Sequence, residues 1–376
     1  MTKDHYFDYE EHFHSQGERK TSRKERKIAT EKDRSKYKKT DVDQKKRQEG
    51  KKQLDLSSLK RGQILSISPE GITVGSSDKL WMCHIKGSLK QEKNRAKNLV
   101  AVGDFVYFEE KDNMTGSICH VEERKSILSR ADNLSRRKEQ LIAVNIDQVI
   151  ITSSVVFPAI KPPLVDRYII AAQKGNMTPI IVVNKIDLLE EGIDGIDPVT
   201  VFVEKEILAE FLKSYEALNI PVIQVSTKTG EGVEELKRVM HEKTSVFSGQ
   251  SGVGKSSLIN AVTGADLKTG DIVFKTSKGS HTTTSTHLVP VDGGGFCIDT
   301  PGIKSFGVWD LDEKELHNYY PEFLPYASEC KFANCTHRFE PECKVQDAVE
   351  RGGISELRFA SYCALMASLA EEHRHR

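Results

Sequence analysis

A glycine-rich loop carries the most specific chemistry in this chain of 376 residues. Residues 249–256 read GQSGVGKS, which matches the phosphate-binding pattern G-x-x-x-x-G-K-[ST] and lies between a strand-like apolar run and a helix-like run. Glycines let backbone N–H groups turn toward phosphate oxygens, and the following helix N-terminus adds partial positive charge. The pattern predicts a nucleoside triphosphate site formed by Gly249, Gln250, Ser251, Gly252, Val253, Gly254, Lys255, Ser256 and Ser257.

Four of the predicted contacts concern the triphosphate tail and its metal ion. We expect the Lys255 ammonium to reach the β- and γ-phosphates, and the Ser256 hydroxyl to bind Mg²⁺. Asp299 opens the sequence DTPG after the apolar run FCI, and it should hold Mg²⁺ through water. The N–H of Gly302, which closes that motif, should meet the γ-phosphate.

A stretch rich in Gly, Ser, Thr and Lys precedes DTPG and has the composition of a mobile switch. It contains GSHTTT at residues 279–284. One threonine of this group should complete the Mg²⁺ shell when the γ-phosphate is present. Among Thr282, Thr283 and Thr284, we assign this role to Thr283.

The sequence NKID at residues 184–187 selects the base. The Asp187 carboxylate can accept hydrogen bonds from guanine N1–H and its exocyclic amine, whereas adenine would leave it facing a lone pair. Lys185 should pack along the base plane, and Asn184 should brace a neighbouring loop. An ordinary turn is the alternative, but a phosphate loop in the same chain favours guanine. The complete base-binding set comprises Asn184, Lys185, Ile186, Asp187, Ser226, Thr227 and Lys228.

Three cysteines and one histidine lie within fourteen residues near the C-terminus. Three thiolates and one imidazole suit tetrahedral Zn²⁺, and four protein ligands close the site, so the ion would be structural. Buried free cysteines are the alternative. The odd total of seven cysteines and the absence of an export signal favour metal binding over disulfides. The predicted zinc ligands are Cys330, Cys335, His337 and Cys343.

The elements that position the nucleotide motifs alternate between strand and helix from about residue 145. Continuous apolar runs such as VIITSSVV and IIVV are typical of strands buried on both faces. Amphipathic runs such as LVDRYIIAAQKGN and GVEELKRVM separate them. This alternation predicts a parallel, doubly wound α/β sheet. A terminal amphipathic helix should follow the cysteine cluster.

Five short alternating runs between about residues 60 and 130 predict a small β-barrel. They read GQILSIS, GITVGSS, LWMCHIKG, DFVYFEE and GSICHVEE, with glycines between them. An OB-type barrel has this strand count and commonly binds RNA. A generic barrel that acts only as a spacer is the alternative.

The net charge of zero conceals a basic N-terminal arm. Residues 17–52 hold 16 Lys and Arg against 7 Asp and Glu, with very few apolar residues. Such a segment cannot bury enough apolar surface to offset the entropy of ordering, about 1–2 kcal/mol per residue. We expect a flexible arm that either contacts RNA phosphates or remains a solvated tail. No apolar stretch reaches the ~18–20 residues of a membrane span, and the N-terminus lacks a secretory core, so we expect no membrane partner.

In combination these motifs resemble the circularly permuted RsgA (YjeQ) family, the bacterial GTPases of small ribosomal subunit biogenesis. NKID and STK precede the phosphate loop, HTTT and DTPG, whereas ordinary small GTPases begin with the phosphate loop. The resemblance covers about residues 60–376. It implies a multidomain protein with an N-terminal OB-type β-barrel, a central α/β P-loop GTPase of permuted motif order, and a C-terminal α-helical zinc-binding subdomain. The expected limits are 1–58 for the basic arm, 59–132 for the barrel, 138–308 for the GTPase and 309–376 for the zinc subdomain.

The resemblance also implies a function. A member of this family binds the small (30S) ribosomal subunit and its 16S rRNA late in assembly, hydrolyses GTP to GDP and phosphate, and so times its release. Hydrolysis should be slow alone and stimulated by the ribosome. We expect a cytoplasmic monomer with one structural Zn²⁺ and with Mg²⁺ bound alongside GTP. In this family the histidine before the threonines has been considered for handling the attacking water, and His281 matches it; a loop cap or an RNA contact is the alternative.

Two rival functions follow from the same residues. Many small GTPases place Gln after the glycine of the DTPG-type motif, but here Ile303 cannot orient water. The chain could therefore be a nucleotide-gated rRNA-binding module with incidental hydrolysis. An ATP-using kinase conflicts with Asp187. Permutation also ties the C-terminal region to the DTPG segment, which suggests that nucleotide state biases how that region sits.

Overall fold

A computed structural model describes most of the chain downstream of residue 55. The chain divides into two units, residues 1–57 and 58–376. The predicted basic arm therefore lies outside the described residues, except for the 3-10 turn η1 (Leu56–Ser58). The described residues are 56–77, 79–87, 89, 99–111, 113–132, 135–190, 195–264, 286–299, 311 and 313–374.

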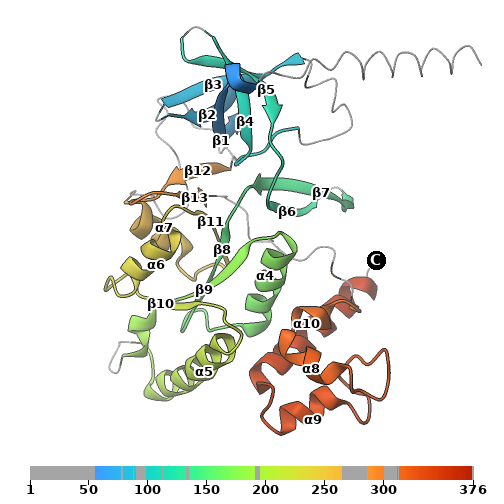
Figure 1. The fold of residues 1–376 in the computed structure, drawn as a ribbon. Coiled ribbons are helices and arrows are strands. Elements are labelled where there is room, and N and C mark those ends of the chain that lie inside the picture. Colours follow the sequence, from blue (N-terminus) through green and yellow to red (C-terminus); the bar gives the residue numbers. More distant parts are fainter. Residues whose placement is uncertain are drawn as a thin grey trace, which may run out of the picture. The chain divides into compact units, whose positions relative to one another are not determined.

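The predicted barrel is present, and it has five strands (Figure 1). Strand β4 pairs with both β5 and β1, so the order β1-β2-β3-β5-β4 closes on itself; only β3 and β5 run parallel. This is the arrangement of an OB-type barrel, and closure leaves no exposed edge to aggregate. The strands are β1 (Lys60–Ser68), β2 (Gly71–Ser76), β3 (Lys79–Ile85), β4 (Phe105–Lys111) and β5 (Thr115–Val121).

Alternation along these strands explains the barrel core. Ile64, Val74 and Val106 are fully or almost fully buried, whereas their strand neighbours are more exposed. Trp81 packs against Phe108 with ring centroids 5.5 Å apart. These aromatic rings fill the interior and present no stacking surface to solvent.

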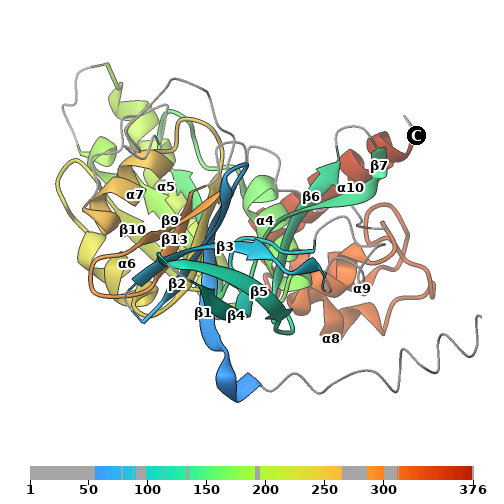
Figure 2. The same ribbon diagram turned by 90° about the horizontal axis from the view of Figure 1, so that it is seen from above.

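A hairpin follows the barrel and was not predicted. Its strands are β6 (Ile127–Asp132) and β7 (Ser135–Val144), which pair antiparallel and lie side by side in Figure 2. Leu128, Ala143 and Val144 are buried near its base. The intervening sequence SRADNLSRRKEQ is highly charged, so it gives little of the apolar alternation by which strands are recognised.

The predicted α/β sheet is confirmed, with one difference. Five strands run parallel in the order β10-β9-β8-β11-β13, and β12 adds to the edge antiparallel to β13. Strand β12 also pairs with β1 of the barrel through His287 and Ser66. Since only a short glycine-rich turn separates β12 from β13, no crossover helix fits between them and the pair must be antiparallel. The strands are β8 (Gln148–Ser154), β9 (Thr178–Asn184), β10 (Val222–Val225), β11 (Thr244–Gly249), β12 (His287–Pro290) and β13 (Phe296–Asp299).

Two separate hydrophobic cores show that the sheet is doubly wound. Ile151 and Val183 belong to one core with residues of α4 and α5, whereas their neighbours Ile150 and Val182 belong to the other with residues of α6 and α7. Successive side chains of a strand point to opposite faces, so each strand serves both cores. The helices are α4 (Pro162–Lys174), α5 (Pro198–Glu216), α6 (Val233–Met240) and α7 (Lys255–Thr263).

The C-terminal region is built from short helical elements around a third core. Tyr320, Phe323 and Tyr362 are buried there, together with Ile170 from α4. The region ends in the predicted terminal helix, which lies beside the shorter helices in both views (Figure 1, Figure 2). Its elements are η4 (Leu316–Tyr319), η5 (Pro321–Phe323), α8 (Leu324–Ala327), α9 (Lys344–Glu350) and α10 (Glu356–Arg374).

Among the residues described, none of the helices combines the length and the apolar character needed to span a membrane.

Candidate nucleotide and metal sites

The phosphate loop connects the end of β11 to the start of α7. Gly252 and Gly254 have φ values of 88° and 92°, in the left-handed region that favours glycine. A Cβ on Gly254 would lie 2.3 Å from the Asn184 Nδ2 atom, and a Cβ on Gly249 would lie 2.1 Å from the Thr152 carbonyl oxygen. The glycines are therefore needed for close approach as well as for backbone conformation.

The Lys255 ammonium lies against this loop. Its Nζ donates hydrogen bonds to the carbonyl oxygens of Gly249, at 2.8 Å, and of Gln250, at 2.7 Å. Lys255 is also the first residue of α7, with Ser256 and Ser257 following in the first turn. The positive charge and the helix N-terminus thus act at one place, which is the electrostatic requirement for holding phosphate.

Asn184 ties three loops together at the carboxyl ends of the strands. It is the last residue of β9 and is almost fully buried. Its Nδ2 donates to the Val253 carbonyl oxygen in the phosphate loop at 2.9 Å, and its Oδ1 accepts the Thr227 N–H at 3.4 Å. One side chain therefore connects the NKID, GQSGVGKS and STK motifs, which are far apart in the sequence.

The Asp187 carboxylate is held by the third loop. Asp187 lies in the 3-10 turn η2 (Ile186–Leu189) and is only 8% exposed. The Ser226 hydroxyl donates to Asp187 Oδ1 at 2.7 Å, whereas Lys228 Nζ is 3.9 Å from Oδ2. The same Ser226 oxygen accepts the N–H groups of Lys228 and Thr229. These contacts orient the carboxylate, and among the described residues only the distant Lys228 ammonium faces its Oδ2.

Lys185 bridges the base loop to a segment that the sequence analysis did not identify. Its Nζ donates to the carbonyl oxygens of Phe157 and Gly252, each at 2.6 Å. Burial lowers the pKa of Lys185, although the Asp187 charge acts in the opposite direction. Phe157 lies just after β8 and its side chain is 65% exposed. The strand-then-proline sequence VVFP was the available signal, because a strand end at this edge of an open α/β sheet borders the ligand site.

Several predicted positions fall outside the description. His281, Thr283 and Gly302 lie beyond the described residues. Asp299 is the last residue of β13, and only its backbone is described. The assignments of His281 to catalysis and of Thr283 and Asp299 to Mg²⁺ remain predictions.

The four predicted metal ligands converge in the C-terminal region. The ligand atoms of Cys330, Cys335, His337 and Cys343 all lie within 4.8 Å of one another. Cys330 Sγ is 3.9 Å from Cys343 Sγ, and each of these sulfurs is 3.5–3.6 Å from His337 Nδ1. A tetrahedron with metal–sulfur bonds of about 2.3 Å has edges of about 3.8 Å. The cluster therefore has the size of a tetrahedral Cys₃His site and could hold a metal ion.

A glutamate organises the loop that carries the histidine. The Glu340 carboxylate accepts the N–H groups of Thr336, at 2.8 Å, Arg338, at 3.1 Å, and Phe339, at 3.2 Å. Burial opposes its ionisation, but these hydrogen bonds outweigh burial and lower the pKa of Glu340 to about 2. His337 has a φ of 60°, so the loop holds it in a conformation that few non-glycine residues adopt.

Comparisons with known proteins agree with this geometry. The family model of the RsgA GTPase matches residues 121–309. The small ribosomal subunit biogenesis GTPase RsgA of Chlorobaculum tepidum is 43% identical over 288 residues, which cover 74% of this chain and 88% of that protein. RsgA 2 of Bacteroides thetaiotaomicron is 38% identical over 296 residues, or 78% of this chain and 91% of that protein.

Solved structures extend the similarity to the fold. YjeQ from Thermotoga maritima superposes with a TM-score of 0.65 at 30% identity and covers 83% of this chain and 99% of its own. YloQ, described as a circularly permuted GTPase, superposes with a TM-score of 0.64 at 26% identity and covers 85% of this chain and 98% of its own. Here too, the NKID segment precedes the phosphate loop along the chain. The chain therefore belongs to the RsgA GTPase family, and its motif order is circularly permuted.

Proposed function

We propose that this GTP hydrolase binds the small ribosomal subunit late in its assembly and hydrolyses GTP to time its own release. The hydrolase activity is that of its family. The relatives are small ribosomal subunit biogenesis GTPases by name, which supports the subunit as partner. The structural observation that carries the proposal is the pair of contacts from Asn184 to the phosphate loop and the STK loop, beside a buried Asp187 carboxylate.

We assign roles within the pocket on the chemistry of each group. Asp187 would accept from guanine N1–H and the exocyclic amine, and Lys255 would neutralise the β- and γ-phosphates. Ser256, Thr283 and Asp299 would hold Mg²⁺, and the Gly302 N–H would meet the γ-phosphate. His281 would position the attacking water, because Ile303 cannot.

We propose Zn²⁺ for the Cys₃His cluster. The three distances of 3.5–3.9 Å among Cys330, His337 and Cys343 are close to the edges of a tetrahedral zinc site, and four protein ligands would leave no open position for catalysis. The ion would then be structural and would hold the loop of residues 330–343 together.

The remaining expectations are part of the same proposal. The domain limits would be 59–132, 138–308 and 309–376, preceded by the basic arm of residues 1–58. The OB-type barrel would contact 16S rRNA, which such barrels commonly do. The protein would act in the cytoplasm as a monomer.

Calorimetry tests whether the pocket selects guanine nucleotides, and a turnover assay tests whether the small subunit is the partner. GTP and GDP should bind in the presence of Mg²⁺, and excess ATP should fail to displace them. Turnover should rise strongly when purified small subunits are added. Equal affinity for ATP and GTP would refute the assigned pocket. Repeating the turnover assay without the first 52 residues tests whether the basic arm contributes to docking.

A nucleotide-gated RNA-binding module is the second candidate, and Ile303 is the observation that favours it. It predicts that GTP changes affinity for small subunits while turnover stays slow with or without them. The stimulated-turnover assay therefore separates the two functions.

A further inference from the structure

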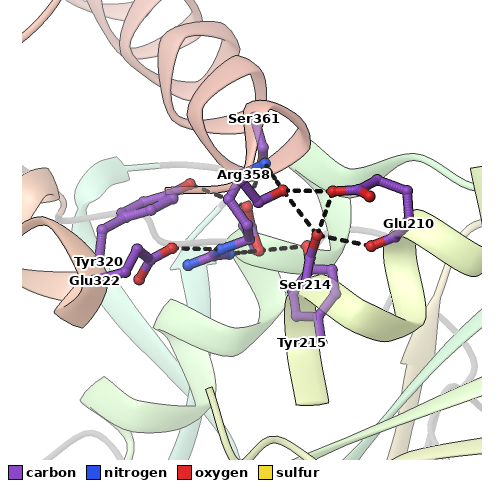
Figure 3. Close-up of polar contacts among 9 residues, drawn as sticks. Glu210, Ser214, Tyr215, Tyr320, Glu322, Arg358 and Ser361 are labelled. Atoms are coloured by element: carbon purple, nitrogen blue, oxygen red, sulfur yellow. Dashed lines mark hydrogen bonds and ion pairs between the residues drawn. The ribbon is translucent and has the colours of Figure 1, made fainter. Parts of the chain in front are cut away.

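A buried carboxylate on α4 receives four donors from distant parts of the chain. Asp166 is only 1% exposed. Its Oδ1 accepts from the Tyr215 hydroxyl on α5 at 2.7 Å, and its Oδ2 accepts from the Tyr320 hydroxyl at 3.1 Å. The Ser361 hydroxyl and the Arg358 guanidinium, both on α10, donate to the same carboxylate. Figure 3 shows these side chains converging from α10, α5 and the segment before η5.

Arg358 completes this network from the C-terminal side. It is 3% exposed, and its Nε donates to Glu322 Oε1 at 2.8 Å (Figure 3). Its guanidinium carbon lies 4.3 Å from the centroid of the Tyr320 ring and 5.2 Å from that of Tyr215. Burial opposes the charge on Arg358, but the Asp166 carboxylate and its other neighbours outweigh burial and raise its pKa further. Arg358 and Asp166 form a buried ion pair, and loss of either group would leave the other without its partner where water cannot replace it.

Further contacts join the C-terminal region to α4 and α5. The Ser355 hydroxyl, just before α10, lies 2.8 Å from the Ser214 hydroxyl and donates to Glu210 Oε1 at 3.1 Å. Arg167 Nη2 donates to the Ser368 hydroxyl at 2.7 Å. Ile170 of α4 is part of the C-terminal core. A contact that combines a buried ion pair, buried hydroxyl groups and a shared apolar core resembles a domain interior more than a sliding surface.

The N-terminus of α4 is also connected to the nucleotide loops. The segment between β8 and α4 contains Phe157, whose carbonyl oxygen accepts from Lys185 Nζ at 2.6 Å. The same ammonium donates to Gly252 in the phosphate loop at 2.6 Å. Asp166 lies in the second turn of α4, close behind this segment. Hydrogen bonds from α10 to α4, the backbone of residues 157–166, and the contacts of Lys185 therefore connect α10 to both nucleotide loops.

We propose that Arg358 and Asp166 are positioning residues, which lock the C-terminal subdomain onto α4, and that the small subunit engages this subdomain as well as the barrel, so that docking is transmitted to the nucleotide pocket through α4. The lock holds the subdomain in one place relative to α4 in the GTP and GDP states. In the alternative model, the DTPG segment would move the C-terminal region when the nucleotide changes. The present proposal differs because the C-terminal region is attached to α4 in both nucleotide states. The proposal rests on the proposed stimulation by small subunits.

The test replaces the charged network by neutral side chains of similar size. In Asp166→Asn/Glu322→Gln/Arg358→Met no buried charge is left unpaired. We expect amide exchange of α10 to rise about tenfold or more. Stimulated kcat should fall about tenfold, whereas unstimulated turnover and the subunit concentration at half-stimulation should each change less than about threefold. Arg358→Lys keeps the charge and should recover part of the stimulation. In the wild type, exchange of α10 should be equal with GDP and with a non-hydrolysable GTP analogue.

Controls separate this proposal from a folding defect and from a wrong function. Lys344→Met removes a partly exposed ion pair with Asp347 in the same subdomain and should leave stimulation intact. Bound zinc should stay at the wild-type level in every variant used. If the triple variant fails to fold, Ser361→Ala and Ser355→Ala weaken the contact of α10 with α4 and α5 in smaller steps. Normal stimulation in a variant whose α10 exchanges faster would overturn the proposal, as would nucleotide-dependent exchange of α10 in the wild type. Absence of stimulation in the wild type would instead refute the proposed function.

Discussion

The nucleotide pocket and the Cys₃His cluster differ in how their polar groups are brought together. The pocket draws on residues 184–187, 226–228 and 249–257, which meet only because parallel strands end at one edge of a sheet. The cluster takes all four ligands from residues 330–343, within a loop that contains little regular structure. The pocket is therefore held by the sheet and its two cores, whereas the cluster is held by its own ligand contacts and by the third core on one side.

This difference has a consequence for what each site contributes to stability. Side chains of the pocket can be changed while strands β8, β9 and β11 remain packed between two cores. The cluster lies against the third core, but its loop contains little regular structure, so a bound ion would supply much of the folding free energy of that loop. Substitutions should accordingly separate into those that impair binding and those that unfold a subdomain.

Metal removal should produce the largest effect and tests this contrast directly. Zinc sites of small domains contribute about 10–16 kcal/mol at neutral pH. Cys343→Ser, or treatment with a strong chelator, should raise amide exchange throughout residues 329–350 while β8, β9 and β11 keep their protection. The matched control is Cys363→Ser, because Cys363 is half-buried in the same subdomain and lies outside the cluster. If the GTPase strands lost protection to the same degree, the contrast between the two regions would be wrong.

Asp187→Ala should give the next largest effect, on binding alone. Loss of a charged hydrogen-bond acceptor for guanine should cost about 2–3 kcal/mol, or roughly 30–150-fold in GTP affinity. The melting temperature should stay close to that of wild type. Glu234→Ala, which removes an exposed acid on α6, should change neither quantity.

Replacing Asp187 by Asn sharpens the same test. Xanthine carries a carbonyl where guanine has its amine, so an amide N–H can donate to it. Asp187→Asn should therefore bind xanthosine triphosphate better than GTP in calorimetry. A variant that still preferred GTP would show that another group reads the base.

Gly254→Ala should affect both binding and stability, because it lies where the loops meet. The left-handed backbone at φ 92° costs a side chain about 1–2 kcal/mol, and the new Cβ would push Asn184 away from the loop. Denaturant unfolding should show that loss, and GTP affinity should fall about tenfold. Gly293→Ala has a similar φ of 88° and open space around the new methyl group, so it measures backbone strain without the collision. Equal effects of both substitutions on GTP binding would contradict a specific role for Asn184.

Ser226→Ala should have the smallest effect. It removes one hydrogen bond to the Asp187 carboxylate, which is worth about 1 kcal/mol, or roughly fivefold in GTP affinity. Thr229→Ala in the same loop should leave affinity unchanged, since its hydroxyl accepts the backbone N–H of Glu231 at 3.4 Å and contacts no pocket side chain in the described part of the chain. A Ser226→Ala protein with wild-type affinity would mean that Asp187 needs no help from this loop.

Much of the fold was predictable because its signals are local. Five barrel strands, the alternating α/β segments and the terminal helix all follow from apolar periodicity over a few residues. The hairpin β6–β7 was missed because its tip is charged, and β12 was missed because four residues give too little pattern. The three loops of the pocket were recognisable because phosphate and guanine each demand particular residue types at fixed spacing.

Residue types and their spacing predicted the chemistry of the sites: a phosphate loop, an acid proposed to read guanine and four candidate metal ligands, each confined to a short segment whose residue types allow few other uses. How these segments are joined became clear only from the fold. Arg358 lies 192 residues from Asp166, and Phe157 meets Lys185 through a backbone carbonyl, which any residue carries. Contacts between residues far apart in the sequence depend on the fold. A backbone carbonyl cannot be recognised as a ligand from the sequence, because every residue has one.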